Sequence, residues 1–482
     1  MSSQTQELEQ ALQALRLQTA NTAEATQAVS TLAENSRSDP DVRLQLSDPQ
    51  VLQKLVGFVE YSVNRHPTTT SSALRCIGNA CIDNDEARAT LTNLGFSWAR
   101  QCLHGDDEVL WLAVKALYNI CSEYDAAQLQ CYREHIHYEL IDMCASPLAL
   151  GSDDRSLLID LLFWITSQKA NVPEEAASEP LPAETLLRLL NLPYYHLIKA
   201  DLDDLATILE IGLTFLRDAS TQTQIVGHHW AGYVWQMLQD VESKIALREL
   251  SGQGPPETKE VLKPYSASLI WTLSDIAANP KFAETYNLDD GWINALIQTI
   301  KEEAAEFFTN FETDIVDQSE LGARLYREAR QTRGNPEGTD PISGGQRLVC
   351  AACQIIGNLL WALPSDQATP LVEEAAIHVA LWRMLVVPDG VNDEDLLHSA
   401  ASLLVQLTRP SQHVRELIGA DEKAKDALTA LCGHKTPQIK QIGVKLLRAL
   451  GRDCPLNQER FGSLAADLTV AAAEDAPMVN GA

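Results

Sequence analysis

The sequence predicts an all-α fold made of stacked helical repeats. The first observation is a recurring pattern in which apolar residues stand at positions i, i+3, i+4 and i+7 around one central polar residue, as on a helix with one buried face. The pattern occurs at residues 74–83, 114–123 and 354–360. The second observation is composition, because Leu and Ala dominate the periodic stretches, and these residues favour helix.

The spacing of the copies predicts a solenoid. Asn79 and Asn119 occupy the same place in two copies and lie forty residues apart, and helical units that recur about every 40 to 47 residues are typical of armadillo and HEAT repeats. The predicted fold class is therefore an armadillo/HEAT-type right-handed solenoid of about eight helical repeats. Their innermost helices are predicted at residues 71–83, 109–123, 154–167, 202–217, 264–278, 347–363, 396–408 and 437–451.

The remaining segments follow from their local chemistry. Residues 1–50 are predicted to form capping helices, which a solenoid needs to cover its first core face. Residues 51–465 form the solenoid, with Pro- and Gly-bearing loops near 169–183, 251–263 and 331–345, and residues 466–482 form a disordered acidic tail. The phrase Ser343-Gly344-Gly345 predicts a helix start near Gln346, because the chain has no Gly-Lys pair for a phosphate-binding loop.

Charge and hydropathy limit the partners. The chain has 66 acidic and 37 basic residues, a net charge of −29, so nucleic acid is not expected as a partner. The charge excess favours either a basic partner or solubility alone. The chain has no run of 18 apolar residues and no signal peptide at its start, so we expect no membrane insertion and a cytoplasmic location.

The sequence offers no positive case for catalysis. Cys350 and Cys353 have redox spacing but lie on a helical apolar run, and the ten cysteines fit free core thiols in a reducing compartment. The pairs His135/His137 and His228/His229 are poorly spaced to share a metal on a helix. We expect no metal, no cofactor and no enzymatic activity.

The candidate binding residues are polar side chains on the innermost helices. Asn79 and Asp83 have i, i+4 spacing, which places both on one helix face, and Asn119 and Glu123 repeat it. An aligned row of carboxylates would attract a Lys- and Arg-rich segment. The full predicted set is Asn79, Asp83, Asn119, Glu123, Asp160, Glu210, Trp271, Asp275 and Asn358. The asparagines have a second interpretation as structural hydrogen-bond donors to the neighbouring repeat, and the carboxylates as a solvated face.

The last repeat carries an excess of positive charge, opposite in sign to the net charge of the chain. Its basic residues are Lys435, Lys440, Lys445, Arg448 and Arg452. A polar cap on the end of the solenoid explains them, and so does a contact to an acidic patch of a partner.

The phrase that runs from Gly78 to Arg88, Gly-Asn-Ala-Cys-Ile-Asp-Asn-Asp-Glu-Ala-Arg, resembles armadillo proteins of the small-GTPase GDP-dissociation stimulator family. The resemblance covers residues 71–125 and extends loosely to about residue 460. It implies binding of Rho- and Ras-type small GTPases that carry a basic, often prenylated, C-terminal tail, with release of bound GDP and chaperoning of the GTPase.

Two alternatives stay open. Armadillo proteins of the ataxin type carry a similar Asn-Ala-Cys-Ile phrase, which fits a scaffold without exchange activity. Importin-like adaptors repeat Trp-x-x-x-Asn pairs, and only Trp271 and Asp275 come near that pattern, because Arg75 and Lys115 stand four residues before Asn79 and Asn119.

Overall fold

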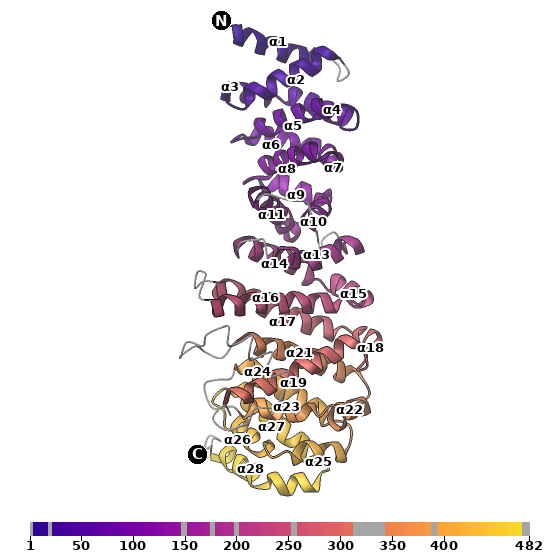
Figure 1. Ribbon diagram of the computed structural model, residues 1–482, viewed down its shortest axis with the longest axis vertical. Helices are drawn as coiled ribbons and strands as arrows, with labels where there is room; N and C mark the ends of the chain where they lie inside the picture. The colour runs from indigo at the N-terminus through magenta and orange to yellow at the C-terminus, as the bar shows by residue number, and fades with distance from the viewer. Residues whose placement is uncertain are drawn as a thin grey trace, which may run out of the picture. The chain divides into compact units, whose positions relative to one another are not determined.

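The structure is a computed structural model that describes residues 3–17, 22–145, 152–173, 179–196, 202–251, 258–311, 343–386 and 393–474. Within these ranges the regular secondary structure is helical, with no strand. The chain divides into two compact units, Met1–Ser220 and Thr221–Ala482, which the sequence analysis did not predict. Both units are all-α solenoids in which helices are layered one upon another (Figure 1).

Unit 1 repeats a pattern of two shorter helices followed by a longer one. Its helices are α1 (Ser3–Leu17), α2 (Ala23–Ser36), α3 (Pro40–Leu46), α4 (Pro49–Ser62), α5 (Pro67–Ala80), α6 (Asp85–Leu94), α7 (Ser97–Leu103), α8 (Asp107–Cys121), α9 (Asp125–Arg133), α10 (Ile136–Cys144), α11 (Ser152–Ser167), the short η1 (Gln168–Asn171), α13 (Ala183–His196) and α14 (Leu202–Leu216). The longer helices form one stack, in which α2, α5, α8, α11 and α14 pack in that order, and α6 packs on α9 as α7 packs on α10.

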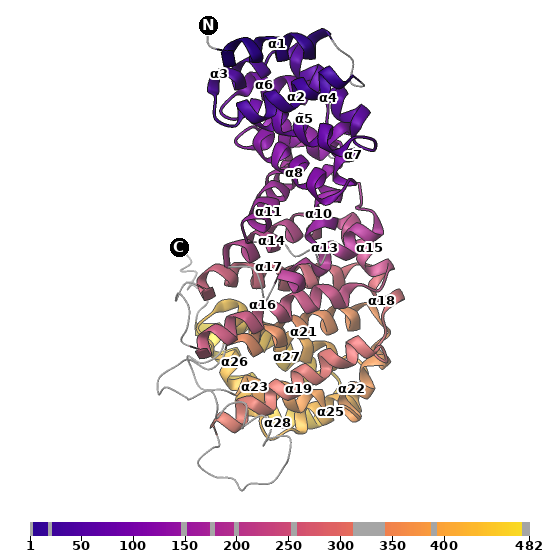
Figure 2. The same cartoon turned by 45° about the horizontal axis from the view of Figure 1, so that its top comes forward.

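Unit 2 begins with long helices and shows the pattern of two shorter helices and a longer one from Thr369 onward. After α15 (Ala219–Gly227), which spans the division, its helices are α16 (Ala231–Ser251), α17 (Thr258–Ala278), α18 (Phe282–Thr285), α19 (Gly291–Phe311), α21 (Ser343–Ala362), η2 (Ser365–Ala368), α22 (Thr369–Glu373), α23 (Ile377–Leu385), α24 (Glu394–Leu407), α25 (Gln412–Ala420), α26 (Ala424–Cys432), α27 (Pro437–Gly451) and α28 (Pro455–Glu474). Its inner stack is α17, α21, α24 and α27, while α19 lies against α21 and α23 (Figure 2).

Local sequence signals set where the helices begin. Pro49 occupies the first turn of α4, and the carboxylate of Asp48 accepts hydrogen bonds from the backbone of Gln50 and Val51 at 2.9 and 3.2 Å. Asp106 caps α8 in the same way, at 3.0 Å from the backbone nitrogen of Val109. Such caps satisfy amide groups that have no partner within the helix, which fixes the start of the helix.

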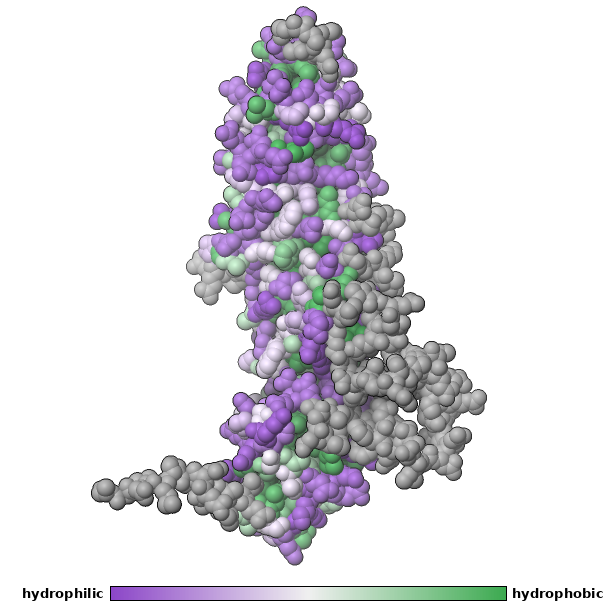
Figure 3. Space-filling model, turned by 90° about the vertical axis from the view of Figure 1, so that its left-hand side faces the viewer, coloured by the Kyte–Doolittle hydropathy of each residue, from purple (hydrophilic) through white to green (hydrophobic). Residues whose placement is uncertain are grey.

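The core of each unit is a row of interlocking aliphatic side chains. Leu, Ile and Val residues of the inner helices are buried, and Trp98 in unit 1 and Trp382 in unit 2 are fully enclosed. The Trp382 indole donates a hydrogen bond of 2.9 Å to the Ile418 carbonyl of the next repeat, so this large side chain also joins neighbouring layers. The described surface in Figure 3 is mostly hydrophilic, with apolar residues in small groups.

The structure confirms the predicted fold class and inner helices. All eight predicted inner segments overlap α5, α8, α11, α14, α17, α21, α24 and α27, although α5 ends at Ala80 and α8 at Cys121, before the predicted ends at 83 and 123. Helix α21 begins at Ser343 and not near Gln346, so residues 343–345 of the predicted loop at 331–345 are helical. Two further boundaries are also wrong. The predicted loop at 251–263 is shorter, because α17 begins at Thr258, and the tail predicted to be disordered from residue 466 is helical to Glu474.

The other two predicted loops fall partly outside the described residues. Residues 174–178 and 331–342 are not described, so these parts of the predictions stay untested. The start of the first loop differs from the prediction, because η1 runs from Gln168 to Asn171.

An aromatic cluster around His137 makes unit 1 sensitive to acid. His137 is buried, and its ring stacks on Tyr132 at 4.5 Å and lies near Phe215 at 6.0 Å between ring centroids. Burial, followed by the nearby His135, lowers the pKa of His137 to about 3 from an ordinary 6.5. The folded protein therefore holds this imidazole neutral, whereas the unfolded chain binds a proton below pH 6.5.

We predict that unit 1 loses stability as the pH falls from 6.5 towards 3, the window between the two pKa values of His137. The loss through this group is about 2 kcal/mol between pH 7.5 and pH 5, at about 1.4 kcal/mol per pKa unit. His137→Phe should remove that part of the pH dependence, measured as the free energy of unfolding in urea. The exposed Asn93 provides the control, Asn93→Ala, which removes no titratable group and should keep the wild-type pH dependence. An identical pH dependence in His137→Phe would contradict the assignment.

Candidate functional site

The three predicted asparagines join neighbouring repeats. The side-chain amide of Asn79 donates to the Ser36 hydroxyl at 2.9 Å, and that of Asn119 donates to the Gly78 carbonyl at 3.1 Å. In unit 2 the amide of Asn358 donates to the Ser274 carbonyl at 3.0 Å. Each bond reaches from one inner helix to the preceding one. The structural interpretation of these residues therefore holds, because their donors are engaged within the protein.

Gly78, the residue before Asn79, allows two inner helices to pack closely. A Cβ atom at this position would lie 3.3 Å from the Cα of Ala116 on α8, closer than ordinary packing allows. The glycine lets α5 and α8 approach closely, and this approach brings the Gly78 carbonyl within reach of Asn119. The Gly-Asn pair therefore stabilises the packing of two neighbouring repeats.

Asp83 and Glu123 do not lie on the inner helices, which corrects the prediction from their spacing. Helix α5 ends at Ala80 and α8 ends at Cys121. Asp83 and Glu123 occupy the following turns with left-handed backbone, at φ of 52° and 54°. Both side chains are exposed, so they remain accessible, but they share no helix face with Asn79 and Asn119.

Two exposed basic residues on the inner helices of unit 1 form ion pairs with acids of the next repeat. Arg75 on α5 forms an ion pair with Glu108 on α8 at 2.9 Å, and Lys115 on α8 forms one with Asp154 on α11 at 3.2 Å. The expected row of carboxylates is therefore interrupted by basic residues. Exposed pairs of this kind contribute little stability, but they reduce the negative potential of this face.

Asp160 and Glu210 extend the inner face of unit 1. Asp160 on α11 is half-buried, and desolvation followed by the charge of Asp204 raises its carboxyl pKa. The rings of Tyr118 and Trp164 lie nearby on α8 and α11, 4.7 Å apart. Glu210 on α14 lies 3.6 Å from Arg217. These two carboxylates are accessible in part, and neither faces a described metal site.

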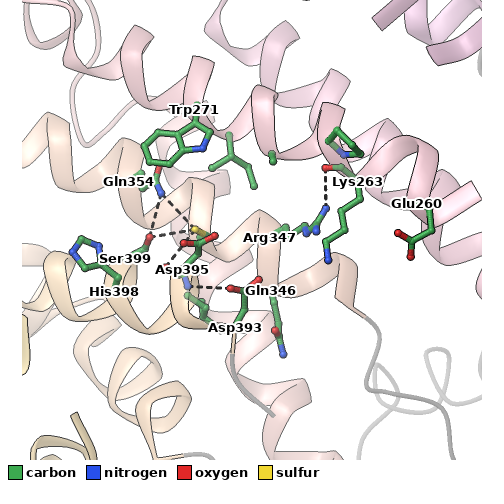
Figure 4. A pocket seen from close by; sticks show the side chains of 15 residues that line it. Glu260, Lys263, Trp271, Gln346, Arg347, Gln354, Asp393, Asp395, His398 and Ser399 are labelled. Atoms are coloured by element: carbon green, nitrogen blue, oxygen red, sulfur yellow. Dashed lines mark hydrogen bonds between the residues drawn. The ribbon is translucent and has the colours of Figure 1, made fainter. Parts of the chain in front are cut away.

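Unit 2 contains a cleft across three successive inner helices. It has a volume of about 550 Å³ and is lined by residues of α17, α21 and α24 and of the turn before α24. Its lining residues are Glu260, Lys263, Pro264, Ala267, Ile270, Trp271, Gln346, Arg347, Cys350, Gln354, Asp393, Asp395, Leu396, His398 and Ser399. Figure 4 shows Trp271, Gln354 and His398 towards one end and Glu260 and Lys263 towards the other.

An exposed indole and carboxylates dominate the mouth of this cleft. Trp271 is 66% exposed, which is unusual for the largest apolar side chain. Asp275 follows it by one helical turn and is exposed, and Glu260, Asp393 and Asp395 add exposed carboxylates. The structure therefore places Trp271 in one cleft with acidic residues of α17 and α24, while Asp275 is exposed on the same helix but does not line the cleft.

The basic residues of the cleft are fewer and partly engaged. Arg347 is largely buried and lies 3.6 Å from the buried carboxylate of Glu242, and it donates a hydrogen bond to the Lys263 carbonyl at 3.4 Å. Its charge is thereby offset within the protein. Lys263 is the exposed lysine of the lining, so the carboxylates outnumber the available cations.

A hydrogen-bond network forms the floor of the cleft. The Gln354 amide donates to the Ser399 hydroxyl at 3.2 Å and to the Cys350 sulfur at 3.5 Å (Figure 4). The amide oxygen of Gln354 is buried without a hydrogen-bond partner in the described structure. A buried acceptor without a donor is costly, and because this oxygen is shielded from solvent, a ligand would reach it only if the Gln354 side chain moved.

The sequence motifs that suggested chemistry are packing features. All ten cysteines are buried and free, which confirms their predicted place in the core. Burial raises the pKa of the Cys350 thiol to about 11, so it is a poor nucleophile. His228 stacks on Trp230 at 4.4 Å, and within the described ranges no group of His, Cys, Asp and Glu is arranged to hold a metal.

Sequence reasoning found Trp271 but missed the rest of the cleft. The run Asp393-Glu394-Asp395 at the start of a predicted inner helix was the available signal. No sequence signal pointed to Gln354, Glu260 or Ser399, because these residues come from helices far apart in the chain. None of the described helices is both long and apolar enough to cross a membrane.

Comparison with known proteins gives structural likenesses only. No family model matches the chain, and no curated protein is similar to it. A solved engineered protein is 15% identical with a TM-score of 0.38, covering 92% of this chain and 98% of its own. A second engineered protein is 16% identical with a TM-score of 0.37, covering 55% of this chain and 97% of its own. A structure from work on a phosphorylation switch between cadherin and β-catenin is 11% identical with a TM-score of 0.30, covering 93% of this chain and 96% of its own.

We predict that Asn119→Ala destabilises unit 1 by about 1–2 kcal/mol, because it removes the hydrogen bond between α8 and α5. The measurement is the free energy of unfolding in urea. The control is Asn93→Ala on α6, whose side chain is exposed, and it should change stability by less than about 0.5 kcal/mol. Equal effects of the two substitutions would refute the role of Asn119 in joining the repeats.

Proposed function

We propose that this chain binds a small GTPase of the Rho or Ras type and promotes release of its GDP. It acts by binding and not by catalysis, in the cytoplasm and without a cofactor. The observation that carries the proposal is the cleft of unit 2, where an exposed tryptophan shares one lining with carboxylates of two repeats. Such a surface complements a Lys- and Arg-rich segment, as at the C-terminus of many small GTPases.

The chemistry of the cleft favours basic side chains. A Lys or Arg side chain over the Trp271 ring gains a cation–π interaction of ~0.5–2 kcal/mol. Asp275 and Asp395 are exposed near that ring and supply charge-assisted hydrogen bonds to the same cation. An extended basic segment uses the indole and the carboxylates at once.

The resemblance in residues 71–125 supports the same class of partner. Asp83 and Glu123 lie in this segment and are exposed at the turns that follow two successive inner helices. We assign them, together with Asp160 and Glu210, to electrostatic attraction of the basic tail. The asparagines Asn79, Asn119 and Asn358 support the surface indirectly, because their amides hold the helices that display it.

Release of GDP follows from differential affinity. If the solenoid binds the nucleotide-free GTPase more tightly than the GDP-bound form, linkage weakens GDP binding by the same factor. No acid, base or metal of the solenoid takes part. Attraction between the tail and the carboxylates accelerates association, and this effect falls as salt screens the charges.

The cleft is not assigned to a prenyl group. Its walls carry five charged residues, Glu260, Lys263, Arg347, Asp393 and Asp395, whereas a prenyl chain gains most from an apolar slot, at ~0.8 kcal/mol per CH₂. Comparison of a prenylated with an unprenylated GTPase separates recognition of the basic tail from recognition of the lipid.

We predict that the purified chain accelerates release of fluorescent GDP from a GTPase with a basic tail. Trp271→Ala combined with Asp395→Asn should weaken binding of the isolated tail peptide by on the order of tenfold, equivalent to ~1.4 kcal/mol. The matched control is Trp361→Ala, because Trp361 is also exposed, at 70%, but does not line the cleft. Equal effects of the two substitutions would remove the cleft from the proposal.

A second pair of substitutions tests unit 1. Asp83→Lys with Glu123→Lys should slow GDP release while leaving the melting temperature nearly unchanged, since both side chains are exposed. Binding of basic peptides without any acceleration of GDP release would favour the alternative function, an armadillo scaffold or adaptor.

A further inference from the structure

The last inner helix carries a basic stripe that the cleft does not use. We define this basic stripe as Lys440, Lys445, Arg448 and Arg452, on and just after α27. Residues 427–452 contain no Asp or Glu, although the whole chain has a net charge of −29. The charge of this helix is therefore opposite to that of the protein that carries it.

The stripe follows one side of α27. The buried side chains of this helix are aliphatic and face its neighbours, and they are Ile439, Ile442, Leu446, Leu447 and Leu450. All four members of the basic stripe are exposed, as are Gln438 and Gln441. The helix thus has an aliphatic inner side and a donor-rich outer side, which is able to bind acceptors over about 18 Å at 1.5 Å per residue.

The basic stripe lacks the intramolecular pairing found in unit 1. There the exposed Arg75 and Lys115 form ion pairs with acids of the next repeat. Within the described ranges no ion pair joins Lys440, Lys445 or Arg448 to an acid. The charges of α27 are therefore available to a partner.

The surroundings limit the size of that partner. The adjacent inner helix α24 begins with the exposed carboxylates of Glu394 and Asp395, and Glu394 accepts a hydrogen bond of 2.6 Å from Thr436 at the start of α27. A long polyanion lying on the stripe would run onto acidic residues. A length of about 18 Å suits five or six residues of an extended peptide, at ~3.3 Å per residue.

We propose that the basic stripe is a docking surface for a short acidic segment, rich in Asp and Glu, of a partner protein. The segment lies along α27 and pairs its carboxylates with Lys440, Lys445 and Arg448. This surface and the cleft select opposite charges, so the two bind different segments. The proposal rests on α27 alone and does not require that the partner be a GTPase.

The test uses the full chain and a fluorescein-labelled peptide of six Glu residues, with binding followed by fluorescence anisotropy in low salt. Wild-type protein should bind it, and the triple variant Lys440→Glu/Lys445→Glu/Arg448→Glu should bind at least tenfold more weakly. A matched triple variant, Arg37→Glu/Lys54→Glu/Arg133→Glu, changes the net charge equally at exposed positions of unit 1. It should bind like wild type.

Three results would overturn the proposal. They are no binding by wild type, equal weakening by both triple variants, and tighter binding of a single-stranded oligonucleotide of matched charge, which would assign the stripe to phosphates. A neutral variant, Lys440→Gln/Lys445→Gln/Arg448→Gln, keeps the test informative if the charge reversal unfolds α27. Because the probe is a peptide, failure here leaves the GDP-release assay unaffected, and failure of that assay leaves this test unaffected.

Discussion

Each repeat of this chain buries one side of its helices against its neighbours, so the shared interface has to fix how two layers are aligned. Aliphatic packing alone allows sliding, because one Leu ridge resembles the next. Directional hydrogen bonds remove that freedom. The amides of Asn119 and Asn358 each reach a backbone carbonyl of the preceding inner helix, and a buried amide without its acceptor is costly. Alignment of the layers depends on these contacts.

This use of polar residues determines what remains for binding. A polar side chain in the middle of an inner helix forms hydrogen bonds to the neighbouring repeat. Polar side chains one turn away reach the surface. In unit 1 the exposed charges Arg75 and Lys115 are paired with acids, so the inner face is balanced. In unit 2 the charges are segregated: carboxylates of α17 and α24 line the cleft that contains Trp271, and α27 is basic. Segregation, more than net charge, gives unit 2 two distinct surfaces.

The sequence predicts the inner helices well, because a 3.6-residue period of buried Leu and Ile is a direct consequence of one-sided burial. It misplaced Asp83 and Glu123, because the helices end at Ala80 and Cys121 and spacing alone does not reveal a left-handed turn. The cleft could not be predicted as a whole. It joins Trp271 to residues of two later repeats. Insertions between these repeats make their alignment with one another unreadable from the sequence.

The ten enclosed thiols have a consequence for experiments on folding. Six lie in unit 1 and four in unit 2, and each is inaccessible to reagents while its own layer stays closed. Alkylation rates measured cysteine by cysteine would therefore report how often individual layers open. The native cysteines thus report local opening of the repeats without any added label.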